Sequence, residues 1–332
     1  MSNAKQIIAM LQSQLEGDEE QFYSIALQVA ASEARQGHRS TADTLRKAVE
    51  AARLAKAKAP VAIPFAAPRG DLAGLITFRD PKLKLKDVTL DGKVVDRLGN
   101  VLRQQNKRTW LHEHGRQPSR RLLFVGPPGS GKTMTAEAVA GELRLPLLSV
   151  RLDALITRYM GETATKLRLI FDETLQRRGV YLFDEFDALG TQRSATNDVA
   201  EMRRVLNSFL QFMEEETSTD SLIIAATNHP ELLDRALLRR FDAVLPFDMP
   251  SDDEIQAIVA AALRPFKADD YQWSKIIEAA ARLSQAEIAR ATEDAVKDAI
   301  LDESDQVGWH AIVLRLHERR EMQEVFSTTT SG

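Results

Sequence analysis

Short apolar runs alternate with helix-patterned segments through the middle of the chain. Most of the gaps between the runs carry apolar residues every three or four positions, which is the spacing of a helix face. Short apolar strands separated by helices predict a mainly parallel sheet that is covered on both faces. We therefore predict an α/β fold, with strands at residues 122–125, 147–151, 180–183, 222–226 and 243–245.

A helical pattern predicts a separate bundle at the N-terminus. Apolar residues recur at helical spacing through residues 1–58, and turns at Gly17 and Gly37 interrupt them. Three prolines, at positions 60, 64 and 68, predict an extended linker over residues 59–75. The bundle is interpreted either as a spacer that stabilises an oligomer or as a docking module for a substrate or partner.

A second helical region is predicted after the α/β region. The strand pattern ends near Pro250, and only helix-patterned segments follow it. The predicted helices cover residues 252–263, 273–283, 285–302 and about 308–325. We predict an α/β domain over 76–247, a helical lid domain over 248–326 and a disordered tail over 327–332.

The first strand of the α/β region leads directly into Gly-Pro-Pro-Gly-Ser-Gly-Lys-Thr, and a helical segment follows. This order and spacing are typical of a phosphate-binding loop, in which glycines turn backbone N–H groups toward phosphate oxygens and the helix adds its positive end. Lys132 is expected to reach the β- and γ-phosphates, and the Thr133 hydroxyl is expected to bind Mg²⁺. The predicted nucleotide-binding residues are Gly126, Pro127, Pro128, Gly129, Ser130, Gly131, Lys132 and Thr133.

Polar residues follow two later strands of the predicted sheet. Asp184 and Glu185 come directly after the run at 180–183, whose position suits a strand neighbouring the phosphate loop. Asp184 is expected to hold Mg²⁺ together with Thr133, and Glu185 to act as the base that activates the attacking water. Asn228 lies two residues after the run at 222–226, and a neutral amide at this strand end can orient the attacking water.

Two adjacent arginines, Arg239 and Arg240, lie between Asn228 and the predicted strand at 243–245. Arginine suits charge stabilisation on a transferring phosphoryl group, because its planar fork binds phosphate and stays protonated. The alternative is a surface ion-pair cluster with Asp234 and Asp242.

The combination of Gly126 to Thr133, Asp184 with Glu185, Asn228 and the two arginines closely resembles the AAA+ ATPases. The resemblance covers roughly residues 85–298. The adjacent arginines are most like those of the spastin, katanin and fidgetin group. The resemblance implies ATP and Mg²⁺ as cofactors, catalytic roles for Glu185, Asn228, Arg239 and Arg240, and a homo-oligomeric ring, usually a hexamer, in which the arginines act on the next subunit's ATP.

Tyr159, Met160 and Gly161 resemble the first pore loop of AAA proteins, which grips a polypeptide in the channel of the ring. A tyrosine on a core-facing turn is the alternative. The chain also resembles the ATPase member of bacterial ATPase and subtilisin-like protease pairs, which implies a serine protease partner acting in trans.

Two features depart from the family: Gln285 replaces a glycine of the lid, and apart from nearby Arg290 no arginine there is clearly placed to contact the nucleotide. The adenine pocket is expected near residues 88–90.

Composition narrows the remaining choices. The chain has 332 residues, no cysteine and six scattered histidines, which exclude disulfides and thiolate metal sites. A net charge of −4 gives no general reason to expect nucleic acid or anionic membrane as a partner. The sequence shows neither a membrane span nor a signal peptide, so a cytoplasmic location is expected. We predict ATP-driven polypeptide remodelling; an ATP-controlled switch that gates a partner without threading is the alternative, and nucleic-acid remodelling is disfavoured.

Overall fold

The computed structural model describes residues 70–155, 162–189, 196–215, 219–233, 235–264 and 271–329, together with a few single residues. The chain divides into two compact units, Met1–Ala66 and Ala67–Gly332. The predicted N-terminal bundle and most of the predicted linker lie outside the described residues. The second unit contains both the predicted α/β region and the predicted helical region.

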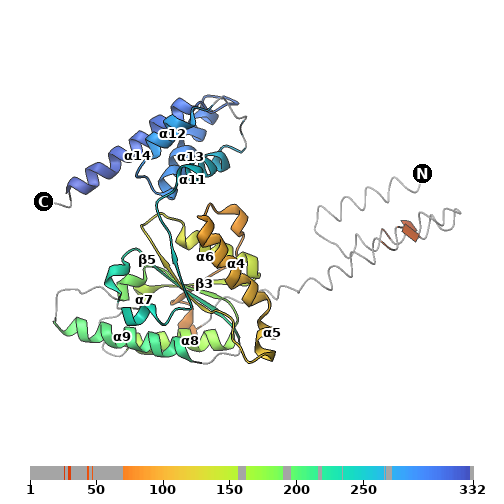
Figure 1. The fold of residues 1–332 in the computed structure, drawn as a ribbon, viewed down its shortest axis with the longest axis vertical. Coiled ribbons are helices and arrows are strands. Elements are labelled where there is room, and N and C mark those ends of the chain that lie inside the picture. Colours follow the sequence, from red (N-terminus) through yellow and green to blue (C-terminus); the bar gives the residue numbers. More distant parts are fainter. Residues whose placement is uncertain are drawn as a thin grey trace. The chain divides into compact units, whose positions relative to one another are not determined.

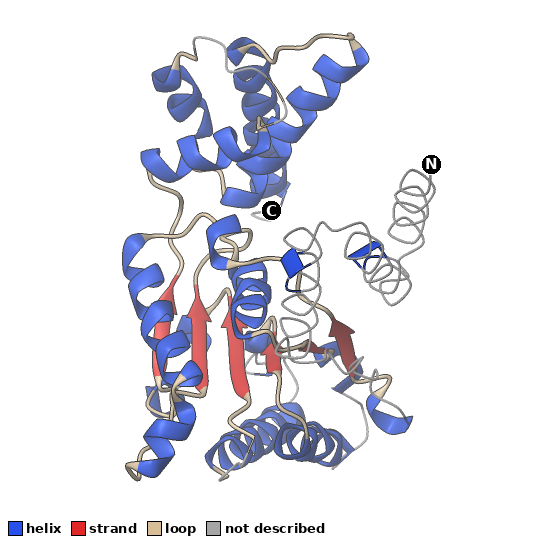
Figure 2. Cartoon of the chain, turned by 90° about the vertical axis from the view of Figure 1, so that its right-hand side faces the viewer, coloured by secondary structure: helices blue, strands red, loops and turns tan. Residues whose placement is uncertain are grey.

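Six strands of the second unit form one sheet, which Figure 2 shows with its strands side by side. Their order is β1-β3-β4-β5-β2-β6, and every pairing is parallel except that of β1 with β3. The strands are β1 (Ile76–Arg79), β2 (Arg121–Val125), β3 (Leu147–Val150), β4 (Val180–Phe183), β5 (Leu222–Thr227) and β6 (Ala243–Pro246). The predicted strands and the mainly parallel sheet are confirmed.

Helices cover both faces of the sheet (Figure 1). Side chains alternate along each strand, so Leu122 and Phe124 of β2 pack in one core with α4 and α6, whereas Leu123 packs in a second core with α8 and α9. All three are fully buried. The covering helices are α4 (Gly92–Asn106), α6 (Lys132–Leu143), α8 (Glu162–Gln176) and α9 (Thr196–Glu214). The α/β fold class is confirmed.

Short elements complete this region. They are η1 (Gly70–Leu72), η2 (Leu85–Asp87), α5 (Arg108–Glu113), α7 (Leu152–Leu155), η3 (Phe186–Leu189), η4 (Pro230–Leu232) and α10 (Arg235–Leu238). Residues 93–112 form two helices, because α4 ends at Asn106 and α5 begins at Arg108.

The helical region has its own core. Its helices are α11 (Asp252–Ala262), α12 (Trp273–Ala280), α13 (Gln285–Leu301) and α14 (Trp309–Thr329). Val259, Ile276, Ile288 and Leu316 are among the fully buried side chains between them. Helix α14 continues to Thr329, into the range of the predicted tail, and no glycine or proline interrupts this helix.

The strand order corrects one expectation. β5 lies between β2 and β4, so the strand that carries Asp184 is not the direct neighbour of the strand that enters the phosphate loop. Helix α6 packs against β3, β4 and β5. Its first residues therefore reach from the end of β2 toward β4. Sequence separation alone cannot fix strand order, because any parallel neighbour can be reached by a helical crossover.

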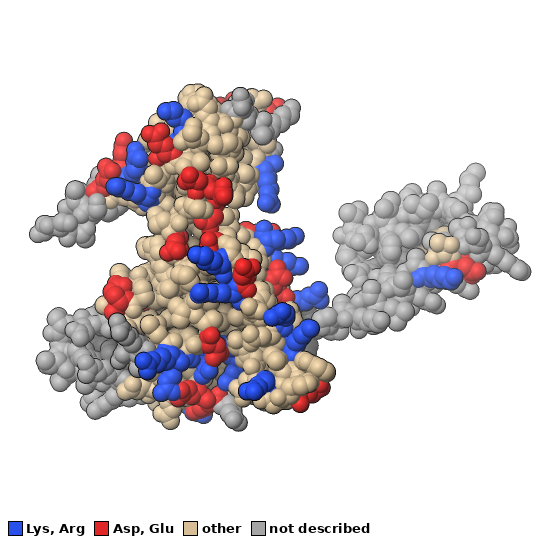
Figure 3. All heavy atoms as spheres, in the orientation of Figure 1, with Lys and Arg blue, Asp and Glu red and all other residues tan. Residues whose placement is uncertain are grey.

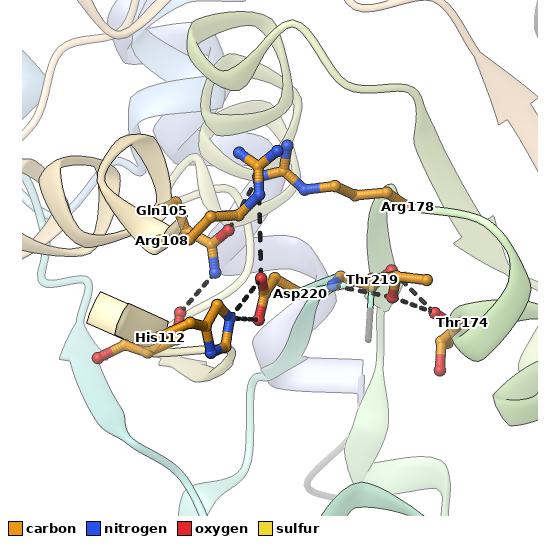
Figure 4. Close-up of polar contacts among 9 residues, drawn as sticks. Gln105, Arg108, His112, Thr174, Arg178, Thr219 and Asp220 are labelled. Atoms are coloured by element: carbon orange, nitrogen blue, oxygen red, sulfur yellow. Dashed lines mark hydrogen bonds and ion pairs between the residues drawn. The ribbon is translucent and has the colours of Figure 1, made fainter. Parts of the chain in front are cut away.

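A polar cluster joins α4 and α5 to the start of β5 (Figure 4). The Asp220 side chain is only 5% exposed and accepts a hydrogen bond from His112 Nε2 at 2.9 Å, with Arg108 Nε at 3.9 Å. Arg178 donates to Gln105 Oε1 at 3.1 Å, and burial lowers the pKa of its guanidinium. A buried carboxylate is tolerated here because these groups face it.

Replacing Asp220 by alanine is expected to lower the free energy of unfolding by about 1 kcal/mol, since the change removes the acceptor of His112 and Arg108, whose half-exposed side chains can then bond to water. Asp220 has a φ of 53°, a conformation that asparagine also tolerates, so Asp220→Asn should cost clearly less. Urea denaturation of both variants measures the difference, with exposed Asp305→Ala as the control. Equal losses for Asp220→Ala and the control would contradict a stabilising role of the cluster.

Candidate active site

A cavity of about 540 Å³ lies where β2, β4 and β5 end, between these strand ends and helices α11 and α13. Its described walls bring together residues that are far apart in the sequence. They include Gly129, Gly131, Lys132, Thr133, Asp184, Glu185 and Asn228 from the α/β region, and Ile258, Ala261, Gln285, Ala286 and Ala289 from the helical region. Most of the predicted nucleotide-binding and catalytic residues therefore share one cavity.

The phosphate loop is tightly enclosed. A Cβ atom on Gly126 would lie 2.0 Å from the backbone oxygen of Phe247, so only glycine fits at the start of the loop. Gly131 precedes the first residue of α6 in the left-handed conformation, with a φ of 88°. The buried Ser130 hydroxyl donates to the Pro127 carbonyl at 2.8 Å and closes the loop on itself. The loop is thus held at the N-terminal end of a 12-residue helix, where backbone N–H groups favour anions.

Lys132 begins helix α6 and points back along the phosphate loop. Its Nζ donates to the carbonyls of Gly126 and Pro127 at 2.8 and 2.7 Å and to Asn228 Oδ1 at 2.9 Å. Burial lowers the pKa of Lys132, while the nearby carboxylates of Asp184 and Asp187 act in the opposite direction. These acceptors hold the ammonium group at the loop, where bound phosphate oxygens would replace some of them.

Thr133 and Asp184 meet across the sheet. The Thr133 hydroxyl donates to Asp184 Oδ2 at 2.5 Å. Thr133 lies on α6, shortly after β2, and Asp184 follows β4, so the contact reaches across the end of β5. A hydroxyl beside a carboxylate fits Mg²⁺, which takes few protein oxygens and completes its shell with phosphate and water. Among the described residues, no group of three or more His, Cys, Asp or Glu side chains could hold a metal ion. Thr133 and Asp184 are the residues that would hold Mg²⁺ beside a bound nucleotide.

Glu185 has an unusual backbone. Its φ is 52°, a left-handed conformation that costs a residue other than glycine about 1–2 kcal/mol. Its N–H donates to Asp184 Oδ1 at 3.0 Å, and the exposed side chain lines the cavity. Because of this turn, the consecutive residues Asp184 and Glu185 both line the cavity.

Asp187 is a site residue that the sequence analysis missed. Its Oδ1 accepts from the Thr227 hydroxyl at 2.8 Å and from the Asn228 N–H at 3.2 Å. Asp187 thereby fixes the end of β5, and Asn228 in turn accepts from Lys132. The signal that points to Asp187 is an acidic residue three positions after Asp184, but its partners become visible only once β4 and β5 are adjacent.

Part of the cavity wall is apolar. Val88 and Thr89, from the segment where the adenine pocket is expected, line the cavity together with Ile258 and Ala289 of the helical region. Leu90 instead packs against the core below. An apolar slot of this kind suits a flat heterocyclic base. Arg290 is exposed and is not among the described residues that line the cavity.

Arg239 and Arg240 lie apart from the residues that line the cavity. Both are exposed on the turn after α10, which buried Leu237 and Phe241 anchor on either side. Arg240 pairs with Glu214 at the end of α9. Within the described residues, the Arg239 side chain makes no hydrogen bond or ion pair.

The predicted ion-pair alternative for the two arginines is not supported at Asp242. Asp242 accepts from the Arg121 guanidinium at 2.6 Å and from the backbone N–H groups of Arg120 and Arg121 at 2.8 and 3.0 Å. Burial alone would raise the pKa of Asp242, but these hydrogen bonds hold it below its ordinary value. Asp234 lies outside the described residues, as do Tyr159, Met160 and Gly161 of the predicted pore loop.

Comparison with known proteins gives a consistent result. A family model described as "ATPase family associated with various cellular activities (AAA)" matches residues 122–249. The AAA family ATPase y4kL of Sinorhizobium fredii is 36% identical over 297 residues, which cover 88% of each chain. A putative 26S proteasome regulatory subunit homolog of Methanothermobacter marburgensis is 32% identical over 204 residues, 60% of this chain and 55% of the relative. The ATP-dependent zinc metalloprotease FtsH of Acidothermus cellulolyticus is 32% identical over 231 residues, 67% of this chain and 35% of the relative.

A phosphate loop at the end of an interior parallel strand, facing acidic residues at a nearby strand end, defines a phosphate-loop nucleotide hydrolase. The match to y4kL over most of both chains places this one more closely. The chain belongs to the AAA ATPase family and is an ATP hydrolase. It spans about half the length of the proteasome-subunit relative and about a third of that of FtsH.

Proposed function

We propose that the chain assembles into a homo-oligomeric ring, most simply a hexamer, in which ATP hydrolysis drives the remodelling of a polypeptide. In this proposal ATP and Mg²⁺ occupy the cavity, Glu185 and Asn228 activate and orient the water, and Arg239 or Arg240 reaches the nucleotide of the next subunit. The loop with Tyr159 and Met160 contacts the polypeptide in the central channel.

The observation that carries the proposal is the charge of the cavity. Lys132 is the only cationic side chain among the described residues that line it, and no arginine does so. A transferring phosphoryl group needs more positive charge than one ammonium and the metal, and arginine is suited to supply it. Exposed arginines that lie outside their own cavity are available to a neighbouring subunit's site, and a head-to-tail contact of this kind generates a ring when its rotation closes.

The names of two relatives support a polypeptide as the substrate. One is named as a proteasome regulatory subunit homolog and the other as an ATP-dependent protease. This chain shares with them the region that contains the ATP site. A separate serine protease of the subtilisin-like type remains a predicted partner.

Surface charge gives little support to the nucleic-acid alternative. On the face shown in Figure 3, basic and acidic side chains of the described residues are interspersed. A nucleic-acid-binding surface typically gathers basic residues along a groove or stripe.

Among the described residues there is also no helix long and apolar enough to cross a bilayer.

A Tyr159→Ala substitution tests threading. We expect a Glu185→Gln ring to retain unfolded casein in the presence of ATP, because it cannot complete hydrolysis. Adding Tyr159→Ala should abolish retention of casein, whereas Tyr159→Phe keeps an aromatic contact and should preserve it. Gel filtration with labelled casein and ATP measures the retained fraction. Equal retention by Tyr159→Ala and Tyr159→Phe would exclude threading through this loop and favour the gating switch.

A further inference from the structure

Helix α13 begins directly on the phosphate loop. The Ala286 N–H donates to the Gly129 carbonyl at 3.0 Å, and a Cβ on Gly129 would lie only 2.5 Å from Ser284 Oγ. The start of α13 is itself fixed, because Ser284 and Glu287 cap it through hydrogen bonds in both directions. Gln285, the first residue of this helix, is therefore held beside the loop.

The Gln285 side chain faces the cavity. It lines the cavity, and its Oε1 lies 3.1 Å from the position that a Cβ on Gly131 would occupy. No hydrogen bond of this side chain occurs within the described part of the chain. A primary amide carries two donors and an acceptor, so this partly buried group has N–H donors available for a ligand. Gly131 precedes α6, whose N-terminal N–H groups bind phosphate.

The electrostatics of the cavity call for such a donor. Besides Lys132, four acidic side chains are among the described residues that line the cavity: Asp87, Asp184, Glu185 and Glu293. A neutral amide can donate to a phosphate oxygen without adding another charge to desolvate.

We propose that Gln285 is a phosphate ligand that the helical region supplies to the bound nucleotide. The amide oxygen faces Gly131 in this structure, and a half-turn of the terminal amide places its N–H there, where it donates to the phosphate; the helical region then senses the phosphates directly and not only the base. The glycine that Gln285 replaces in the family pattern has no side chain with which to do so. The inference rests on the proposed assignment of this cavity as the nucleotide site.

Binding of fluorescent ADP in the full-length chain tests the proposal. Gln285→Met keeps the length of the side chain but removes its donors, and we expect ADP affinity to fall about tenfold, as for the loss of a hydrogen bond to a charged group. Gln285→Glu keeps the shape and places a negative charge beside the phosphates, so its loss should be larger and should shrink as salt is raised. Arg290→Ala, exposed on the same helix, should bind ADP as the unaltered chain does.

Two outcomes would overturn the proposal. Unchanged ADP affinity in Gln285→Met means that the amide donates to no phosphate, and tighter binding means that it occupies the phosphate position instead. Lys132→Ala separates this failure from that of the site itself. If Lys132→Ala also binds ADP normally, the cavity is not the nucleotide site; if it loses ADP while Gln285→Met does not, only the role of Gln285 is wrong. Thermal unfolding of each variant checks that the fold is intact.

Discussion

A Glu185→Gln variant is expected to bind ATP and to hydrolyse it at least about a hundredfold more slowly, the usual effect of removing a general base. Glutamine has the same shape, so the phosphate and metal contacts proposed for Lys132, Thr133 and Asp184 should remain. Turnover is measured by phosphate release, and binding by retention of radiolabelled ATP. An exposed glutamate on α14, Glu321, gives the control substitution to glutamine, which should leave both unchanged.

The backbone at Glu185 gives this prediction a second readout. Because its φ is 52°, glycine relieves strain at this position. Glu185→Gly should therefore lose hydrolysis as Glu185→Gln does, without the loss of stability that a glycine substitution normally causes. Near-normal turnover in either variant would show that another group activates the water.

Replacing Arg239 by alanine is expected to lower turnover by about a thousandfold or more, the effect of removing an arginine that acts in trans on a transferring phosphoryl group. Arg240→Ala should have the smaller effect, because Arg240 is already paired with Glu214 in its own chain. ADP affinity should stay close to that of the unaltered chain in both variants, since neither arginine lines its own cavity.

Mixing two inactive variants tests whether the site is shared. Arg239→Ala subunits keep Glu185, and Glu185→Gln subunits keep Arg239. In a ring with shared sites, an Arg239→Ala subunit next to a Glu185→Gln subunit has one complete site, so the mixture should recover hydrolysis that neither variant shows alone. No recovery, in a mixture shown by cross-linking to contain both variants in one oligomer, would mean that Arg239 acts within its own subunit.

The sequence predicted β2 to β6 within one residue at each end, because each is a short apolar run bounded by polar or helix-patterned residues, but it did not predict β1. It also predicted which strand ends carry Asp184 and Asn228. The pairing of β1 with β3 and the place of β5 between β2 and β4 were not predicted, since they depend on contacts between distant segments.

Local geometry in the site was also beyond sequence reasoning. The left-handed backbone of Glu185 has no sequence signal, since glutamate is not a residue that favours this conformation. The partners of Asp187 come from a different strand, and the approach of Gln285 to Gly131 depends on how α13 packs on the loop.

The pairing of Asp242 with the start of β2 has a consequence for a ring. Asp242 follows the two arginines and binds the backbone of Arg120 and Arg121, where β2 begins, while the same strand ends at the phosphate loop. A pull on Arg239 from the neighbouring nucleotide would be transmitted along a buried strand to the chain's own Gly126. In the proposed ring, consecutive sites would then be mechanically linked through β2.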